Sequence, residues 1–302
     1  MQLAPNEETS MPRKLRSSTT AALIVLVAVT AVWGATFLMV KNAIALVPVM
    51  DFLGVRFVVA AAVMIAIYPR CLRHITRRSL LRGTLLGLAL GSGYVLQTFG
   101  LVTSSATVSG FITGMFVVFT PILSAVLLRQ RTTRYTWLAV TLAVVGLALL
   151  ALRGWSLGRG ELLTLGCALF FGLHIVGLGA WASEDDAYAL ALIQVVTVGL
   201  ISAAAAAPDG INIPARVEVW AAVAVTAVFA TAAAFVAQTW AQSLVPATPA
   251  AVVMTMEPVF AGIFGVVLGG DALTPRIVAG ATCILAAMFV VQLKQSSAPR
   301  QG

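Results

Sequence analysis

Three ionisable side chains lie inside long runs of apolar residues: Arg56, His174 and Glu257. A charged side chain at the centre of a bilayer costs about 2.5–3.5 kcal/mol on insertion scales, so such residues are retained for a reason. A buried guanidinium can bind a carboxylate, an imidazole can titrate near neutral pH, and a carboxylate can take up a proton. The chemistry open to these residues is therefore ion binding and proton exchange.

Each of these residues also has a structural interpretation. Arg56 follows Asp51 closely, so it either extends to the outer rim and pairs with Asp51 or faces a cavity as a cation for a ligand carboxylate. His174 is either neutral and hydrogen-bonded or titrates in the physiological range. From the sequence alone, both alternatives stay open for both residues.

Glu257 stands directly before Pro258 in an apolar segment. Proline removes one backbone hydrogen bond and leaves a carbonyl group free. An acidic side chain beside such a break either exchanges a coupling proton or caps and pairs near the helix bend. We list Glu257 and Pro258 as candidates for coupling or gating.

Uncharged polar and aromatic residues extend the candidate site. Tyr94 and Gln97 share a helix face, and Gln238 recurs at a matching position later in the chain. The two glutamines either line a cavity or act as interhelical hydrogen-bonding residues. Trp33 and Trp240 are candidates for aromatic walls, although an aromatic residue in a span is more often a packing residue.

The composition indicates which elements carry these residues. Hydrophobic residues make up 60% of the 302 residues and charged residues only 10%, and the mean hydropathy is +0.99. So few charges cannot cover soluble domains, and about 20 apolar residues cross a bilayer. The sequence predicts an all-α integral membrane protein with ten spans: 20–42, 49–68, 80–101, 106–128, 135–152, 161–181, 187–207, 217–241, 247–268 and 276–293.

The distribution of Lys and Arg predicts the orientation. With both termini in the cytoplasm, most of these residues fall on the cytoplasmic side, including those of the arginine-rich loop after the second span. We expect a multi-pass protein of the plasma (inner) membrane with cytoplasmic tails at 1–19 and 295–302. The first apolar run is read as a retained helix rather than a cleaved signal.

The chain contains an internal repeat. Residues 94–153 align without a gap with residues 235–294, and Gln97-Thr98 and Ala106-Thr107 meet Gln238-Thr239 and Ala247-Thr248. This divides the chain into repeats 20–153 and 161–294 of five helices each. Because five is odd, the second repeat enters the membrane from the opposite side, which predicts an inverted-topology pair with a site between the halves.

Four short segments carry a family resemblance: Trp33-Gly34-Ala35-Thr36-Phe37, Gly110-Phe111-Ile112-Thr113-Gly114, Met256-Glu257-Pro258-Val259-Phe260 and Gly270-Asp271-Ala272-Leu273-Thr274. The chain resembles the EamA-type carriers of the drug/metabolite transporter superfamily, as two EamA-like units over about residues 20–293. It departs from them at Asp271, where Glu is commoner, and Phe116 stands opposite Glu257, so a role for that acidic position is not symmetric. The resemblance implies a ten-helix carrier of small metabolites, most often an exporter of amino acids or similar compounds.

We therefore expect a secondary-active transporter that works by alternating access, with efflux favoured. The alternatives are a polytopic membrane enzyme and a non-transporting membrane scaffold or sensor. The sequence has neither a P-loop nor a metal-ligand cluster, so we expect no catalytic residues, metal or cofactor. The expected partners are a small-molecule substrate and the lipid bilayer, not nucleic acid; the oligomeric state is left open, a monomer being one option.

Overall fold

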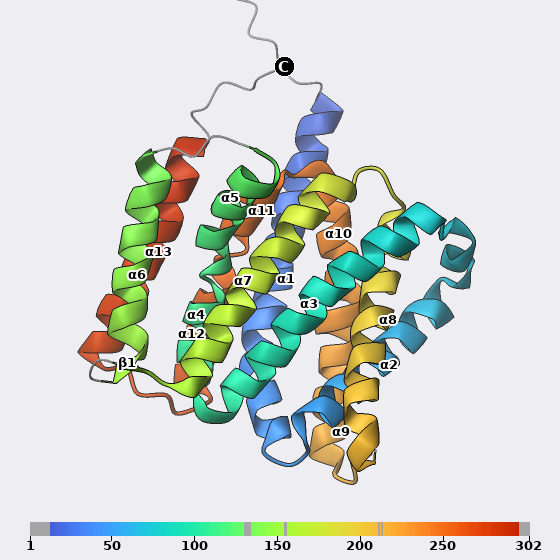
Figure 1. The fold of residues 1–302 in the computed structure, drawn as a ribbon, viewed down its shortest axis with the longest axis horizontal. Helices are drawn as coiled ribbons and strands as arrows, with labels where there is room; N and C mark the ends of the chain where they lie inside the picture. Colours follow the sequence, from blue (N-terminus) through green and yellow to red (C-terminus); the bar gives the residue numbers. More distant parts are fainter. Residues whose placement is uncertain (1–12, 130–133, 154–155, 211, 213, 296–302) are drawn as a thin grey trace, which may run out of the picture.

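A computed structural model describes residues 13–129, 134–153, 156–210, 212 and 214–295, and nearly all of them are helical (Figure 1). Eight helical segments in this part are long and apolar enough to cross a bilayer. They are α1 (Arg13–Ile44), α2 (Val49–Ile67), α3 (Arg77–Thr103), α4 (Ala106–Thr113) with α5 (Phe116–Leu127), α7 (Arg159–Trp181), α8 (Ala187–Ala206), α9 (Val217–Ala227) with η3 (Val228–Ala233) and α10 (Ala234–Leu244), and α11 (Ala247–Val253) with α12 (Met256–Val267).

The eight segments agree with eight predicted spans to within a few residues. The remaining predicted spans, 135–152 and 276–293, coincide with helices α6 (Arg134–Ala151) and α13 (Pro275–Gln295), which pack together at one edge of the bundle (Figure 1). Because these two are not among the eight, a total of ten crossings stays a prediction.

A few short elements depart from the predicted pattern. Helix α1 begins at Arg13, inside the segment predicted as a polar tail, whereas residues 1–12 and 296–302 lie outside the described residues. Among the described residues, β1 (Leu152–Arg153) and β2 (Ser156–Leu157) form one antiparallel pair in an otherwise helical chain. Two short 3₁₀ helices, η1 (Pro69–His74) and η2 (Ala207–Asp209), follow α2 and α8.

Three membrane-spanning segments are irregular in their middle. Gly114 and Met115 form a turn between α4 and α5, and Met254 and Thr255 form one between α11 and α12. These two breaks fall at nearly equivalent positions of the sequence repeat. The third irregularity is the π-helical turn η3, and such turns are frequent at functional sites.

Small residues allow the helices to approach closely. Helices α2 and α8 run antiparallel, because Gly54 packs against Ser202 and Ala203 near one end whereas Gly199 packs against Phe57 further along. Helices α3 and α8 run parallel, with Gly83 at Ile193 and Gly87 at Thr197. Such small-residue contacts are the usual means of tight helix packing in membranes.

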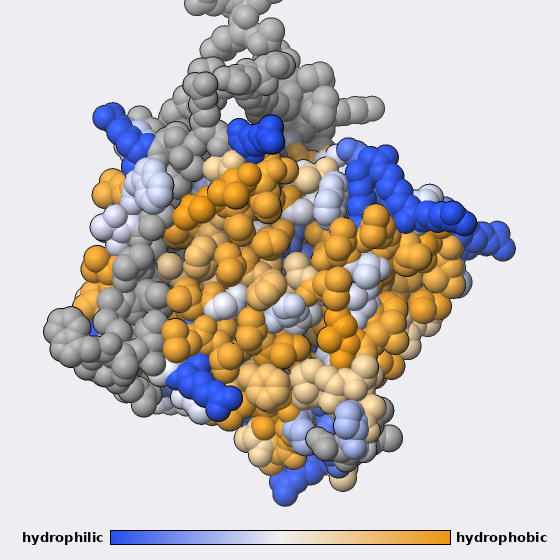
Figure 2. Space-filling model, in the orientation of Figure 1, coloured by the Kyte–Doolittle hydropathy of each residue, from blue (hydrophilic) through white to orange (hydrophobic). Residues whose placement is uncertain are grey.

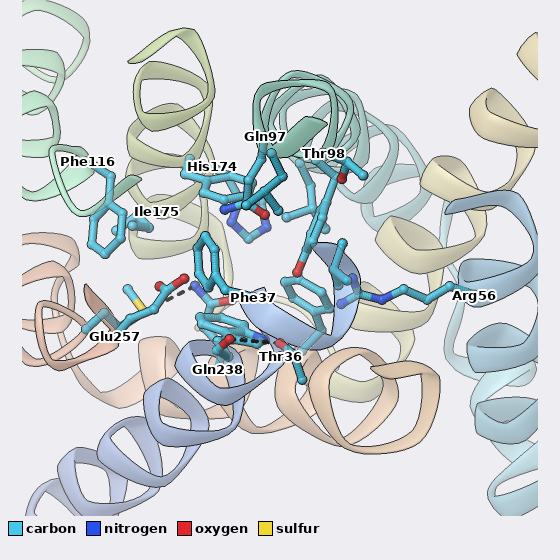
Figure 3. Close-up of a pocket in the computed structure, with 18 residues that line it drawn as sticks. Thr36, Phe37, Arg56, Gln97, Thr98, Phe116, His174, Ile175, Gln238 and Glu257 are labelled. Atoms are coloured by element: carbon cyan, nitrogen blue, oxygen red, sulfur yellow. Dashed lines mark hydrogen bonds between the residues drawn. The ribbon is translucent and has the colours of Figure 1, made fainter. Parts of the chain in front are cut away.

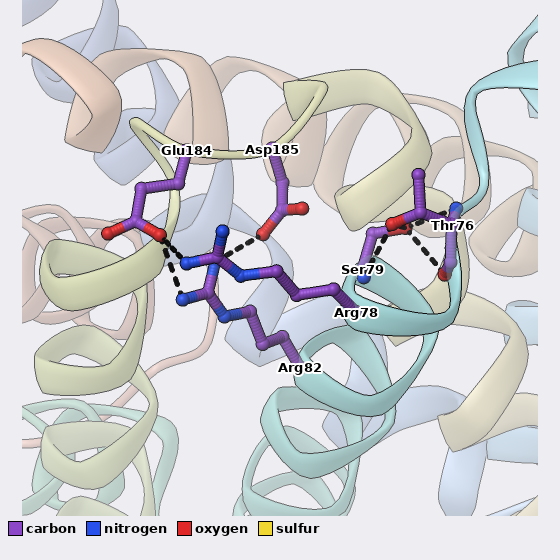
Figure 4. Close-up of polar contacts among 6 residues, drawn as sticks. All are labelled: Thr76, Arg78, Ser79, Arg82, Glu184 and Asp185. Carbon is purple, nitrogen blue, oxygen red and sulfur yellow. Dashed lines mark hydrogen bonds and ion pairs between the residues drawn. The ribbon is translucent and has the colours of Figure 1, made fainter.

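Polar contacts join the chain at both ends of the bundle. At one end Arg82 pairs with Glu184 and Asp185 at 2.9 Å each, and Arg78 also pairs with Glu184 (Figure 4). At the other end Asp51 accepts hydrogen bonds from the backbone and side chain of Asn212, both at 3.2 Å. Between the two ends the face shown in Figure 2 is mainly apolar, as a lipid-facing surface must be.

Candidate functional site

A cavity lies inside the bundle and is lined by residues of α1, α2, α3, α5, α7, α10 and α12 and by Met254 at the α11–α12 break (Figure 3). About 40 Å³ of it is open to the centres of water-sized molecules, which is room for roughly two or three waters.

The structure brings most of the predicted site residues to this cavity. Those that line it are Trp33, Arg56, Tyr94, Gln97, His174, Gln238 and Glu257. They come from both sequence repeats and lie far apart in the chain. Their roles in binding or coupling stay predictions, but their convergence on one cavity is a property of the fold.

Trp240 and Pro258 do not line the cavity. Trp240 is 37% exposed and borders an apolar groove on the outside of the bundle, beside Val25 and Val236. It follows Gln238 by two residues, about 200° around the helix, so the two side chains face opposite ways. Trp240 therefore lies outside this cavity, and a substrate-binding role for it stays a prediction. Pro258 lies in the first turn of α12, where its missing N–H group has no intrahelical acceptor to lose.

Arg56 is buried, with 2% of its surface exposed. Its Nε donates to Thr231 Oγ1 at 2.9 Å, and its guanidinium carbon lies 4.9 Å from the ring centroid of Tyr94. Asp51 turns instead toward Asn212. Within the described chain Arg56 has no carboxylate partner, so the structure favours the cavity-facing cation over the pairing with Asp51.

The π-helical turn η3 positions this side of the cavity. Thr231, which accepts from Arg56, lies in η3 and donates its own hydroxyl hydrogen to Thr226 O at 2.8 Å. Ala230, also in η3, accepts from Trp33 Nε1 at 2.8 Å. A π-helical turn changes the usual i→i−4 hydrogen-bond pattern of the carbonyl groups. Here the carbonyl oxygen of Ala230 accepts a hydrogen bond from the Trp33 indole.

Glu257 is the second residue of α12, directly after the break, and is 5% exposed. Its backbone N–H donates to Met254 O at 3.0 Å. In the part of the chain that the structure describes, its carboxylate has neither an ion pair nor a hydrogen bond. The equivalent position after the α4–α5 break is Phe116, which also lines the cavity. The two breaks thus direct one acidic and one apolar side chain to the same space.

The remaining polar lining residues are hydrogen-bonded on one side. Gln97 Nε2 lies 3.2 Å from Thr113 Oγ1, and His174 Nε2 lies 2.6 Å from Gln194 Oε1. Gln238 Nε2 donates to Gln242 Oε1 at 3.0 Å. These partners hold the lining side chains in fixed orientations.

Several lining residues, most of them aromatic or aliphatic, were not predicted from the sequence. Tyr94 makes edge contacts with Phe57, Phe171 and Phe235, at centroid distances of 5.1, 5.4 and 6.1 Å. The further lining residues are Thr36, Phe37, Val40, Leu90, Thr98, Leu101, Ile175 and Met254. Helical spacing was the available signal, because Phe171 and Phe235 each lie three residues before a predicted polar residue.

The site therefore offers an arginine on one side, an unpaired carboxylate on another, and apolar rings between them. No group of His, Cys, Asp and Glu side chains among the described residues could hold a metal ion. A cation, an anion and amide groups around a partly apolar cavity can bind a small polar molecule reversibly.

Comparison with known proteins identifies the protein class. The model of the EamA-like transporter family matches residues 20–152 and 158–293. The chain belongs to this family. A relative from Archaeoglobus fulgidus, named only an uncharacterized transporter, is 33% identical over 267 residues, covering 88% of this chain and 84% of the relative.

A solved crystal structure is also similar to this EamA-family chain, with a TM-score of 0.71. The match covers 92% of this chain and 98% of the other, at 17% sequence identity. At that identity the likeness shows the fold alone. The EamA-family chain is thus a multi-pass membrane transporter, and neither relative names a substrate.

Proposed function

We propose that the chain is a secondary-active carrier that moves a small metabolite, an amino acid or related compound, through the central cavity by alternating access. The carrying observation is that Arg56 and Glu257 both line this cavity and neither has an oppositely charged partner within the described chain. Uncompensated charges inside a bundle are costly, so they are retained where a ligand or an ion compensates them. Arg56 serves as the site for a substrate carboxylate.

The proposal includes ten crossings arranged as two inverted five-helix repeats. In the sequence repeat α2 corresponds to α8, and the close contacts at Gly54 and Gly199 run these two helices antiparallel. The paired breaks before Phe116 and Glu257 support the same arrangement. Inverted repeats supply two nearly equivalent conformations that open the central site to opposite sides.

The small volume of the cavity and the polar contacts at both ends of the bundle support a constricted conformation within this cycle. The arginine-rich loops support a location in the plasma membrane with both termini in the cytoplasm. Within this proposal we favour efflux.

Counterflow in proteoliposomes tests the proposal directly. Vesicles containing the full chain are preloaded with unlabelled amino acids or other small metabolites, one at a time, and uptake of the labelled compound is followed. Saturable exchange that is absent from protein-free vesicles is expected for at least one compound. Failure of every compound, together with a non-saturable leak, would overturn the carrier.

Cysteine accessibility gives a second test of alternating access. Single cysteines replace Gln97 and Gln238 in a chain whose Cys71, Cys167 and Cys283 are changed to serine or alanine. We expect labelling from each side of the membrane, with one side protected when substrate is saturating. Labelling from one side only, whatever the substrate concentration, contradicts alternating access.

A further inference from the structure

Two hydrogen-bond relays end at the cavity, and each begins at a main-chain carbonyl group. A carbonyl oxygen can only accept, so it fixes which way round the adjoining amide side chain lies. Amide orientation is assigned from such networks, and here the network leaves one assignment. The polarity of each relay therefore determines what its last atom offers to a ligand.

The first relay runs from Leu190 through Gln194 to His174. Gln194 Nε2 donates to Leu190 O at 3.0 Å, so Gln194 Oε1 is the atom that faces His174 Nε2 at 2.6 Å. His174 Nε2 must then carry a hydrogen. His174 is 2% exposed and has no carboxylate contact among the described residues, so the imidazole is neutral and its Nδ1 bears a lone pair.

The second relay runs from Ile175 through Gln242 to Gln238. Gln242 Nε2 donates to Ile175 O at 3.0 Å, so Gln242 Oε1 accepts from Gln238 Nε2, also at 3.0 Å. Gln238 Oε1 is left as the free end of the relay. It is fully buried and has no hydrogen-bond partner in the described chain, and Gln238 is 2% exposed.

The residues that end the two relays line the same cavity as Glu257, and these three residues come from α7, α10 and α12. His174 adjoins Ile175, and its ring centroid is 6.1 Å from that of Phe235, one helical turn before Gln238. Gln238 Nε2 lies 3.7 Å from Met254 Sδ, in the turn that precedes Glu257. His174, Gln238 and Glu257 all line the cavity (Figure 3).

We propose that His174 Nδ1, Gln238 Oε1 and the Glu257 carboxylate form a site for a primary ammonium group of the substrate. Each of the three can only accept a hydrogen bond in the state described, and a primary ammonium has three N–H donors and no acceptor. This inference rests on the proposed carrier function. It adds a site for the ammonium group to the site for the carboxylate at Arg56. Gln194 and Gln242 are positioning residues, because they fix which atoms face the ligand.

A purely structural role for the relays does not account well for the unpaired, buried Gln238 Oε1. Interhelical hydrogen bonds need no buried acceptor left unpaired at a cavity wall, and an unpaired buried acceptor destabilises the protein. A bound ammonium supplies the missing donors. A quaternary ammonium cannot donate, and a hydroxyl group supplies one donor and no charge.

Three probes with the same isobutyl side chain test the site: leucine, its 2-hydroxy analogue, and the bulkier N,N,N-trimethyl-leucine. Their side chain suits the aromatic and aliphatic walls, and all three keep the carboxylate. Binding to the full chain in nanodiscs is measured by titration calorimetry, and competition by counterflow. Leucine is expected to bind at least about tenfold more tightly than either analogue, since hydrogen bonds to charged groups contribute about that much.

The relay variants separate ligand binding from packing. Gln238→Leu is expected to weaken the binding of leucine about tenfold or more, with little effect on the binding of the hydroxy analogue. Gln242→Leu leaves the Gln238 amide free to turn, so it is expected to reduce the ratio of leucine to hydroxy-analogue affinity, which loss of packing alone would not change. Thr239→Val, on the same helix but outside the cavity lining, is the matched control and should keep the wild-type ratio.

The outcomes separate the two proposals. Equal affinity for the three probes, or an unchanged preference in Gln238→Leu and Gln242→Leu, overturns the ammonium site while saturable exchange leaves the carrier standing. Failure of all three probes to bind also overturns the ammonium site. Exchange of other compounds in the counterflow panel then decides independently on the carrier.

Discussion

At the scale of single residues, Arg56 is the first side chain whose removal should change substrate selectivity. Arg56→Leu deletes the cation and its hydrogen bond to Thr231. We expect the KM of a carboxylate-bearing substrate to rise at least about tenfold, because a charged hydrogen bond contributes about 1.5–3 kcal/mol. Competition by leucine and by leucinamide, which lacks the carboxylate, measures the change.

Arg73→Leu is the matched control for this substitution. It also removes one arginine, but Arg73 is exposed in η1 and away from the cavity. Transport by this variant should match the wild type. An equal loss for leucine and leucinamide in Arg56→Leu would instead indicate that Arg56 holds the fold together and does not select carboxylates.

Glu257 carries the second prediction at this scale. The Glu257 carboxylate lines the cavity and can accept hydrogen bonds from a substrate ammonium group only when it is ionised, so its protonation should set a pH dependence of transport. Glu257→Gln keeps the shape and fixes the neutral form. We expect transport rates measured across pH 5–9 to lose most of their pH dependence. Wild-type turnover and an unchanged pH profile would remove Glu257 from the coupling mechanism.

Much of the site could be predicted residue by residue, because a polar side chain in an apolar span is rare and costly. This criterion selected Arg56, His174 and Glu257, which the fold brings together. It could not find the relays, since the carbonyl groups that orient Gln238 and Gln194 depend on packing between helices. It gives no comparable signal for an aromatic residue such as Trp240, which lies outside the cavity lining.

At the scale of helices, the span limits followed from hydrophobic length, whereas the local irregularities followed only in part. Pro258 marked the α11–α12 break, but nothing comparable marks η3, whose sequence of Val, Phe, Ala and Thr is compatible with an ordinary helix. The π-helical turn is stabilised by its long-range contacts with Arg56 and Trp33. These contacts join different helices, so they could not be predicted from the sequence of one helix.

The packing of α1 on α12 yields the prediction at this scale. A Cβ atom at Gly34 would lie 2.5 Å from Phe260 Cβ and 2.8 Å from Ala261 N and from Glu257 O. Gly34→Ala must therefore push the two helices apart, at a cost of about 1–3 kcal/mol. We expect a lower unfolding midpoint in detergent, followed by intrinsic fluorescence.

Gly91→Ala provides the comparison, because its Cβ would lie 3.5 Å from Val198 Cγ2, an ordinary contact. Its unfolding midpoint should stay near the wild-type value. If the two variants have the same midpoint, the α1–α12 contact is adaptable, and close packing there does not limit stability.

At the scale of the whole molecule, the charge distribution predicted which loops share a side, but not which side chains pair. The turn between α7 and α8 contributes Glu184 and Asp185, and the start of α3 contributes Arg78 and Arg82. These contacts join the first sequence repeat to the second at one end of the bundle (Figure 4). Any motion that opens the cavity at this end must separate them.

This ion-pair cluster gives the last prediction. The hydrogen bond from Arg82, followed by the charges of Arg78 and Arg82, lowers the pKa of Glu184 below its ordinary value of 4.5. A lowered folded-state pKa means that the pairing stabilises the protein fully above the unfolded pKa and is lost as the pH falls through the folded pKa. Since Glu184 is exposed, salt should weaken the effect. The unfolding midpoint of wild type minus that of Glu184→Gln should therefore be positive at pH 7 in low salt and should shrink toward zero as the pH falls below the ordinary pKa of 4.5 and through the lowered pKa of the folded state. If this difference in midpoint grows as the pH falls, or does not change with salt concentration, the ion pairs do not stabilise this end of the bundle.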